Sequence, residues 1–135
     1  MTYALDTNII SYVINGNAIL DKRLRQVTRI GNKVVLPLMV YYEVYRGLLA
    51  NNATAKLQKF LRFCERTGIQ DLTVGDMTEA SILFAHRKRK GLSLDDADLI
   101  IAAQCITNGY TLVTNNAKHF TGIEGLRYEN WQSEM

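Results

Sequence analysis

Three carboxylates, Asp6, Glu43 and Asp98, come from separate segments of the chain, each near the end of an expected strand or the start of an expected helix. Asn115 and Asn116 directly follow another expected strand. Carboxylates that share a pocket repel one another, so at least one should have a raised pKa in the empty protein. A divalent cation relieves this repulsion, and oxygen donors without His or Cys favour magnesium or manganese over zinc. Such an ion activates water to attack phosphorus, so the set favours phosphoryl-transfer chemistry.

Each carboxylate also has an ordinary structural explanation when it is considered alone. Asp98 lies in the first turn of a helix, where a negative charge interacts favourably with the helix dipole and stabilises the helix by about 0.3–1 kcal/mol. Glu43 can be a solvated acid paired with Arg46, three residues further along the same helix. Asp6 is harder to explain in this way, because a carboxylate after a buried strand needs partners and an isolated buried charge is very costly. The prediction of phosphoryl-transfer chemistry therefore rests on three carboxylates from separate segments meeting at one place, and not on any one of them.

The elements that position these residues alternate between short apolar runs and amphipathic helices. Strands are expected at 2–5, 33–36, 69–74, 110–114 and 126–128. Helices are expected at 9–15, with Asn8 as its cap, and at about 18–30, 38–50, 53–66, 76–90 and 95–108. Short apolar strands separated by helices predict a three-layer α/β/α fold with a central, mainly parallel sheet of four to five strands. In such sheets the chemistry gathers outside the carboxyl ends of the strands.

Length and composition indicate one globular domain over residues 1–135. The net charge is +3, and 47% of the residues are hydrophobic and 21% charged, which excludes intrinsic disorder and a polybasic tail. The longest apolar runs, such as 36–42, are far below the roughly 20 residues that span a bilayer. No basic segment precedes an apolar one at the N-terminus, so no signal peptide is expected. Together with the two cysteines, Cys64 and Cys105, which we expect to be reduced thiols, this predicts a cytoplasmic protein without a membrane segment.

Basic residues offer candidate contacts to nucleic-acid phosphates. The densest run of charge contains Arg87, Lys88 and Arg89, at the end of an expected helix. Such a run is equally compatible with a solvated helix end, where cations favour the dipole, and with phosphate binding. Arg46 follows Glu43 by one helical turn and is placed to reach a scissile phosphate, and Lys118 is a further candidate. The modest net charge predicts weak electrostatic steering toward RNA.

Four blocks of sequence, in this order, resemble the PIN-domain ribonucleases and, more narrowly, the VapC toxins of bacterial toxin–antitoxin pairs. They are LDTNIIS at 5–11, the helix around Glu43, DADLIIAA at 96–103 and LVTNNAKHF at 112–120. The resemblance extends from Asp6 to Trp131. It implies a PIN fold, an endoribonuclease activity that depends on Mg²⁺ or Mn²⁺, and an RNA substrate, commonly transfer RNA. It also implies a cognate VapB antitoxin that covers the site, and a homodimer.

The resemblance also implies roles for particular residues. Asp6, Glu43 and Asp98 match the three acidic positions that hold the metal in the family. Asp6 and Asp98 match its most direct ligands, and Glu43 the acid that ligates the ion or orients a water. Asp96 matches an acid often found beside the third position.

Two positions depart from the family pattern. Asn116 stands where many members carry a fourth acid, and His119 falls where the same block often has another acid. These departures leave open whether one metal ion or two are bound. Thr114, at the end of a strand, is placed to hydrogen-bond Asp6 or a metal-bound water, a supporting role behind the ligands.

Other classes of protein remain as alternatives. Some PIN-like domains bind RNA without catalysis, although the three acids are intact here. A strand-end Asp followed by Thr, as at Asp6, also occurs in phosphatases that form an aspartyl phosphate, but these usually need a longer chain with a cap. Receiver domains keep their phosphoacceptor after a middle strand, where this sequence offers only Asp76. Neither of these two alternatives explains Glu43 and Asp98 together.

Overall fold

The structure is a computed structural model that describes residues 1–131. Its elements follow along the chain as β1 (Thr2–Leu5), α1 (Thr7–Ile14), α2 (Ala18–Arg29), β2 (Lys33–Pro37), α3 (Leu38–Ala50), α4 (Thr54–Thr67), β3 (Ile69–Gln70), α5 (Val74–Arg89), α6 (Asp96–Asn108), β4 (Thr111–Val113), α7 (Ala117–Phe120) and β5 (Arg127–Glu129). The domain expected from the sequence extends to residue 135, so its end, 132–135, lies outside the described part. Every described helix is too short or too polar to cross a lipid bilayer.

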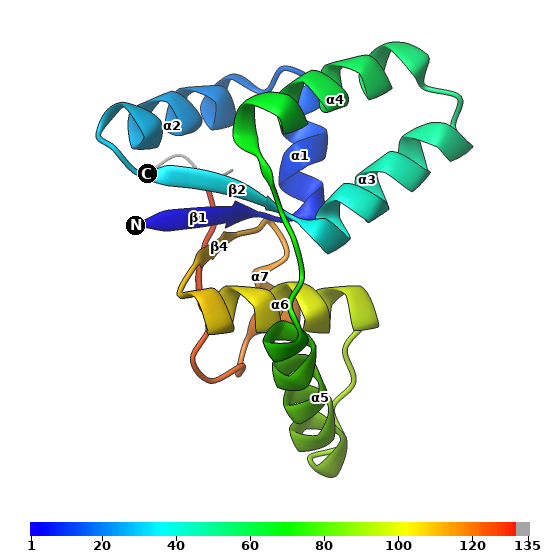
Figure 1. The fold of residues 1–135 in the computed structure, drawn as a ribbon, viewed down its shortest axis with the longest axis vertical. Coiled ribbons are helices and arrows are strands. Elements are labelled where there is room, and N and C mark those ends of the chain that lie inside the picture. The colour runs from blue at the N-terminus through cyan, green and yellow to red at the C-terminus, as the bar shows by residue number, and fades with distance from the viewer. Residues whose placement is uncertain (132–135) are drawn as a thin grey trace.

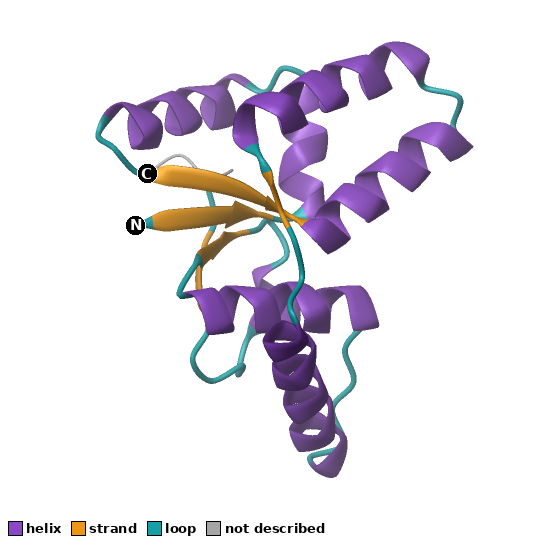
Figure 2. Ribbon diagram, in the orientation of Figure 1, coloured by secondary structure: helices purple, strands orange, loops and turns teal. Residues whose placement is uncertain are grey.

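The strands form one five-stranded sheet in the order β3-β2-β1-β4-β5, and every pair in it is parallel. β1 is the central strand, with Ala4 opposite Val35 of β2 on one side and Leu112 of β4 on the other. Figures 1 and 2 show α1 to α4 on one face of the sheet and α5 and α6 on the other. The expected three-layer α/β/α fold with a mainly parallel sheet is therefore confirmed.

The first helix begins earlier than the sequence suggested. Asp6, with an extended backbone (φ −77°, ψ 164°), caps α1, and its Oδ1 accepts a hydrogen bond from the Thr7 N–H at 2.8 Å. The prediction that Asn8 is the cap was wrong, because Asn8 lies inside the first turn. Asp, Thr and Asn are all favoured at helix starts, so residue type did not separate the three positions. Because β1 ends at Leu5, the next residue, Asp6, takes the cap position.

The prediction of a strand at 69–74 was also mostly wrong. β3 contains only Ile69 and Gln70, and α5 begins at Val74. Thr73 and Asp76 form a capping box: the Thr73 Oγ1 accepts from the Asp76 N–H at 3.1 Å, and an Asp76 carboxylate oxygen accepts from the Thr73 N–H at 3.0 Å. This pairing of side chains three positions apart satisfies two free N–H groups at the helix start and outweighs the β-propensity of the apolar residues. The short helix α7 was not expected.

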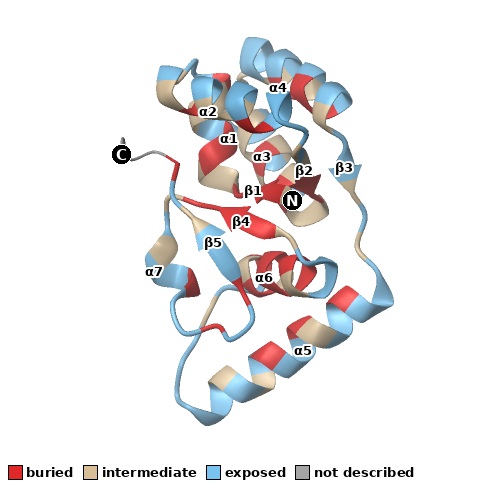
Figure 3. Ribbon diagram, turned by 90° about the vertical axis from the view of Figure 1, so that its left-hand side faces the viewer, coloured by how far each residue is buried: buried red, intermediate tan, exposed pale blue. Residues whose placement is uncertain are grey.

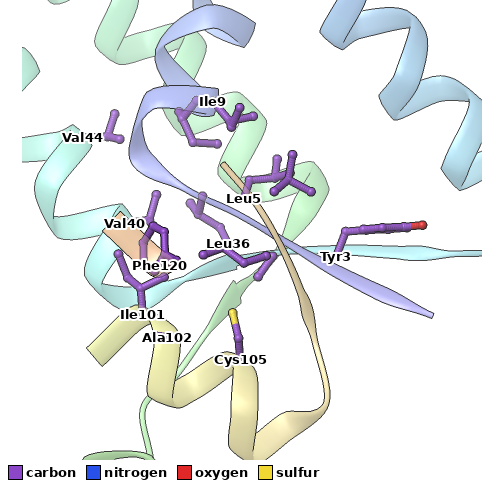
Figure 4. Packing of buried hydrophobic residues seen from close by; sticks show 14 of the residues in the cluster. Tyr3, Leu5, Ile9, Leu36, Val40, Val44, Ile101, Ala102, Cys105 and Phe120 are labelled. Carbon is purple, nitrogen blue, oxygen red and sulfur yellow. The ribbon is translucent and has the colours of Figure 1, made fainter. Parts of the chain in front are cut away.

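The hydrophobic core lies between the sheet and its two helix layers (Figure 3). Leu36 of β2 is fully buried, as are Ile101 and Cys105 of α6, whose side chains face the strands in Figure 4. Seven residues of α6 are buried, which anchors this helix, and with it its first turn, against the sheet. Cys105 and Cys64 are buried free thiols, as the sequence predicted.

Candidate active site

Asp6 stands at the carboxyl end of the central strand and is only 3% exposed. Its Oδ2 accepts a hydrogen bond from the Thr114 hydroxyl at 2.7 Å and a longer one from the Asn8 amide at 3.4 Å. Its Oδ1 accepts from the Thr7 N–H. Burial raises the pKa of Asp6, while the hydrogen bonds from Thr114, Thr7 and Asn8 oppose that rise. The predicted contact between Thr114 and Asp6 is confirmed.

Glu43 reaches the same edge of the sheet from α3. Its Oε1 accepts a hydrogen bond from the Thr7 hydroxyl at 2.7 Å, which links α3 to the first turn of α1. Its Oε2 lies 3.9 Å from a guanidinium nitrogen of Arg46. Arg46 is more than half exposed, and its guanidinium lies 4.8 Å from the centre of the exposed Tyr42 ring. Thr7 therefore bonds to Asp6 through its backbone and to Glu43 through its side chain.

Asp98 lies in the first turn of α6, where it is mostly buried, with 18% of its side chain exposed. Burial raises the pKa of Asp98, and the negative charge of Asp6 raises it further. The His119 Nδ1 of α7 lies 3.2 Å from the Asp98 Oδ2 and opposes the rise. The pKa is thus raised at both acids, by burial at Asp6 and by burial together with the charge of Asp6 at Asp98. His119 also lowers the pKa of Asp6, so the imidazole lies near both acids.

The three carboxylates are not gathered tightly around one point. Residues 1–131 contain no group of three His, Cys, Asp or Glu side chains close enough to hold one metal ion. Asp6 and Asp98 nevertheless interact through their charges, and Glu43 is linked to Asp6 through Thr7. Mg²⁺ in proteins is commonly bound by one or two carboxylates and keeps several waters. The donor set therefore fits a hydrated ion held by Asp6 and Asp98 better than a rigid cage of three carboxylates.

The side chains of Asp96 and Asn116, the two further candidates, lie outside this hydrogen-bonded group. Asp96 is exposed and lines a small cavity with Met77 and Phe84 of α5. The Asn116 side chain is exposed, and its contribution is a backbone N–H that donates to the Thr114 Oγ1 at 2.9 Å. Asn116 therefore helps to hold the threonine that binds Asp6.

The basic candidates occupy different parts of the surface. Lys88 and Arg89 are exposed at the C-terminal end of α5, which projects beyond α6 and away from the sheet (Figures 1 and 3). Arg87 is half-buried and lines a cavity with Ile123. Lys118 is exposed on α7, next to the histidine that contacts Asp98. Arg46 and Lys118 thus flank the carboxylates, whereas the run on α5 is separated from them by α6.

Sequence reasoning missed two contacts that shape the site. The Asn8 Oδ1 accepts a hydrogen bond from the Asn115 N–H at 3.0 Å, and the Asn115 amide donates to the Tyr12 hydroxyl at 3.0 Å. These bonds fasten the loop after β4 to α1. The pairing of His119 with Asp98 was missed as well, because nothing in the local sequence indicates that the short helix α7 turns back over α6.

Comparison with known proteins agrees with this geometry. The PIN domain family model matches residues 3–125. Ribonuclease VapC2 of Rickettsia felis is 32% identical over 132 residues, which cover 97% of this chain and 98% of that protein. The tRNA(fMet)-specific endonuclease VapC of Shigella flexneri is 25% identical over 131 residues, with 97% and 98% coverage. The solved VapBC2 complex of Rickettsia felis, bound to a DNA fragment from its promoter, contains a chain that superposes with a TM-score of 0.90 and covers 97% of this chain and 99% of its own length.

These matches define the class of the protein: the chain belongs to the PIN-domain family. Within that family it belongs to the VapC ribonucleases, as the 32% identity over nearly the full chain shows. The resemblance inferred from the four sequence blocks is therefore confirmed.

Proposed function

We propose that this protein is a metal-dependent endoribonuclease and the toxin of a type II toxin–antitoxin pair, acting in the cytoplasm. The observation that supports the proposal most directly is the buried Asp6 at the end of the central strand, with its charge coupled to Asp98. Burying a carboxylate beside another acid is costly, so the arrangement calls for a cation. Carboxylates whose pKa values are shifted by burial and by a neighbouring charge often occur at functional sites.

In this proposal Asp6 and Asp98 hold Mg²⁺ or Mn²⁺, and Glu43 orients a water or joins the ligands. When bound, such an ion would supply a water of lowered pKa and positive charge beside the phosphate. Thr114 and Thr7 keep the carboxylates of Asp6 and Glu43 in fixed orientations. Arg46, exposed beside Glu43, is placed to contact the scissile phosphate.

The substrate and the partners are proposed from the relatives. Transfer RNA is the proposed substrate, since the Shigella flexneri relative is named as specific for tRNA(fMet). A VapB-type antitoxin is the proposed partner, since the solved relatives from Rickettsia felis and nontypeable Haemophilus influenzae are VapBC complexes. We also propose that the protein forms a homodimer.

The test is cleavage of total transfer RNA by purified, antitoxin-free protein. Wild type should produce discrete fragments with Mg²⁺ or Mn²⁺ and none with chelator, and Asp6→Asn should be inactive. Asp6→Asn is a suitable control because Asn is also a good helix cap and leaves α1 its first-turn partner. RNA binding without cleavage in both metals would instead favour the binding module. Formation of an acyl phosphate on Asp6 from a small phosphodonor would favour the phosphatase class.

A further inference from the structure

A groove of about 290 Å³ begins at the candidate active site and follows the surface where α1 and α3 pack together. Thr7 and Glu43 line the groove near the carboxylates. Asn51, at the end of α3, and Lys56, in the first turns of α4, also line it. Glu43 and Asn51 are eight positions apart on one helix, so the groove extends about 12 Å from the acid. It is continuous with the site rather than a separate cavity.

The groove has an apolar floor and a polar rim. The floor is made by Ile14, Val44 and Leu48. The rim carries Ser11 of α1, Asn15 directly after α1, Asn51 and Lys56, all of which are exposed. Within residues 1–131, none of these four side chains makes a hydrogen bond or an ion pair. Hydroxyl, amide and ammonium groups are thus available to a ligand along the whole length of the groove.

Gly47 lies in the middle of α3 and lines the groove between Glu43 and Asn51. A glycine inside a helix is destabilising relative to alanine. Packing does not explain its presence, because a Cβ atom at this position would meet nothing within 4 Å. The absence of a side chain instead keeps the groove open. This is what a site for an elongated ligand requires.

We propose that the groove binds the segment of single-stranded RNA that flanks the scissile phosphodiester, with a backbone phosphate at Lys56. The inference rests on the proposed ribonuclease function. Amide and hydroxyl groups are donors to phosphate and ribose oxygens, and such contacts position a strand without reading its sequence. The apolar floor suits the face of a ribose or an unstacked base. The cation lies at a distance from Glu43, so one strand can place its reacting phosphate at the acids and a neighbouring phosphate at Lys56.

The first experiment uses two substitutions of Gly47 that differ only in size. Both should fold, because the position has free space and either residue favours a helix more than glycine does. With an RNA oligonucleotide that wild type cleaves, Gly47→Leu should raise KM by about tenfold and leave kcat within about twofold, the pattern of a lost binding contact. Gly47→Ala adds only one methyl group to the groove and should raise KM far less than Gly47→Leu does. Thermal melts of both variants verify the fold.

The second experiment removes the cation. Lys56→Gln should weaken binding of the same oligonucleotide to an uncleaving Asp98→Asn background and reduce the slope of log Kd against log salt by about 0.7, the value for one phosphate contact on a single strand. Lys59→Gln is the matched control, since Lys59 is exposed on the same helix but does not line the groove. Its slope should be unchanged.

The outcomes separate this inference from the proposed function. If wild type cleaves no RNA, the proposed function and this inference fail together. If wild type cleaves RNA and Gly47→Leu has an unchanged KM, this inference alone is overturned. If Gly47→Leu retains its KM but loses affinity for a VapB-type antitoxin, the groove belongs to the antitoxin, which likewise overturns the inference.

Discussion

The hydroxyl of Thr114 lies 2.7 Å from the Oδ2 of Asp6, although 108 positions separate the two residues in the chain. The bond is buried, and it joins the ends of the adjacent strands β1 and β4. The same oxygen of Thr114 accepts the Asn116 N–H, which orients the hydroxyl hydrogen toward the carboxylate. One side chain thus fixes the orientation of the most buried acid of the site.

Thr114→Val should destabilise the protein by about 1–3 kcal/mol, because it leaves a buried carboxylate and a backbone N–H without this partner while keeping the side-chain shape. Thr114→Ser retains the hydroxyl and should lose about 1 kcal/mol at most, from the missing methyl group. Equilibrium unfolding in urea measures both values. Equal stability of the Val variant and wild type would mean that the bond contributes nothing.

Asp98→Asn should stabilise the metal-free protein at neutral pH. The pKa of Asp98 is raised in the folded state, so the folded protein binds a proton more tightly than the unfolded chain and wild type loses stability as pH rises through this window. The substitution removes that loss. Its advantage should disappear when the pH falls below the ordinary pKa of aspartate, where Asp98 is protonated in both states.

Thermal melts in chelator across a pH series measure this effect. Asp96→Asn is the matched control, because Asp96 is exposed in the same turn of α6 and should give no gain. Melting of Asp98→Asn several degrees below wild type at neutral pH would contradict the prediction. Added Mg²⁺ should stabilise wild type more than it stabilises Asp98→Asn.

Replacement of Lys88 and Arg89 by Gln should weaken RNA affinity and reduce the salt slope of binding by about one to two, as expected for two phosphate contacts. Arg87 is left in place because it is half-buried, so its loss would also affect packing. The pair Lys22 and Arg29, exposed on α2 across the sheet, provides a control of equal charge. Identical slopes for wild type and the Lys88/Arg89 variant would assign these cations to a solvated helix end.

Trp131→Ala should cost about 3–5 kcal/mol of stability, the usual loss for a buried aromatic residue. Trp131 is fully buried, packs edge-on against Tyr3 with ring centres 5.0 Å apart, and lies 5.3 Å from the guanidinium of Arg23. Its Nε1 donates to a Glu129 carboxylate oxygen at 2.9 Å. Glu129→Gln keeps an acceptor and should cost far less. Chemical denaturation compares the two, and similar unfolding midpoints would refute this account of the C-terminal segment.

Those parts of the fold that depend on hydrophobic pattern were predictable from the sequence. The runs that became β1, β2 and β4 and the helices α3 and α6 were located within one or two residues, because each combines an apolar pattern with clear boundaries. Asp6, Glu43 and Asp98 were assigned to one edge of the sheet from the direction of the parallel strands and from their positions at a strand end or near a helix start. The parts that depend on side-chain hydrogen bonds were harder, as Asp6 capping α1 and Thr73 pairing with Asp76 show.

The placement of the three acids near one edge of the sheet was predictable, and the contacts of the residues around them were less so. The sequence suggested that Thr114 supports Asp6, since the threonine ends a strand next to β1. It did not indicate that His119 contacts Asp98, because that contact depends on the path of the chain after β4. The sequence placed Asp76 at the start of a helix and, in an alternative class of protein, as a phosphoacceptor. It is a buried acid that bonds to Thr73, Thr107 and Asn108 and ties α5 to α6.

The central position of β1 has a consequence for synthesis on the ribosome. Its neighbour β4, the threonine that orients Asp6 and the helix that carries Asp98 all come from the last third of the chain. A nascent chain that has emerged only through α5 contains Asp6 and Glu43 but neither Asp98 nor the second strand that flanks β1. Contacts of such long sequence separation form late in folding. Co-translational folding therefore delays assembly of the site around Asp6 until α6 and β4 have emerged from the ribosome.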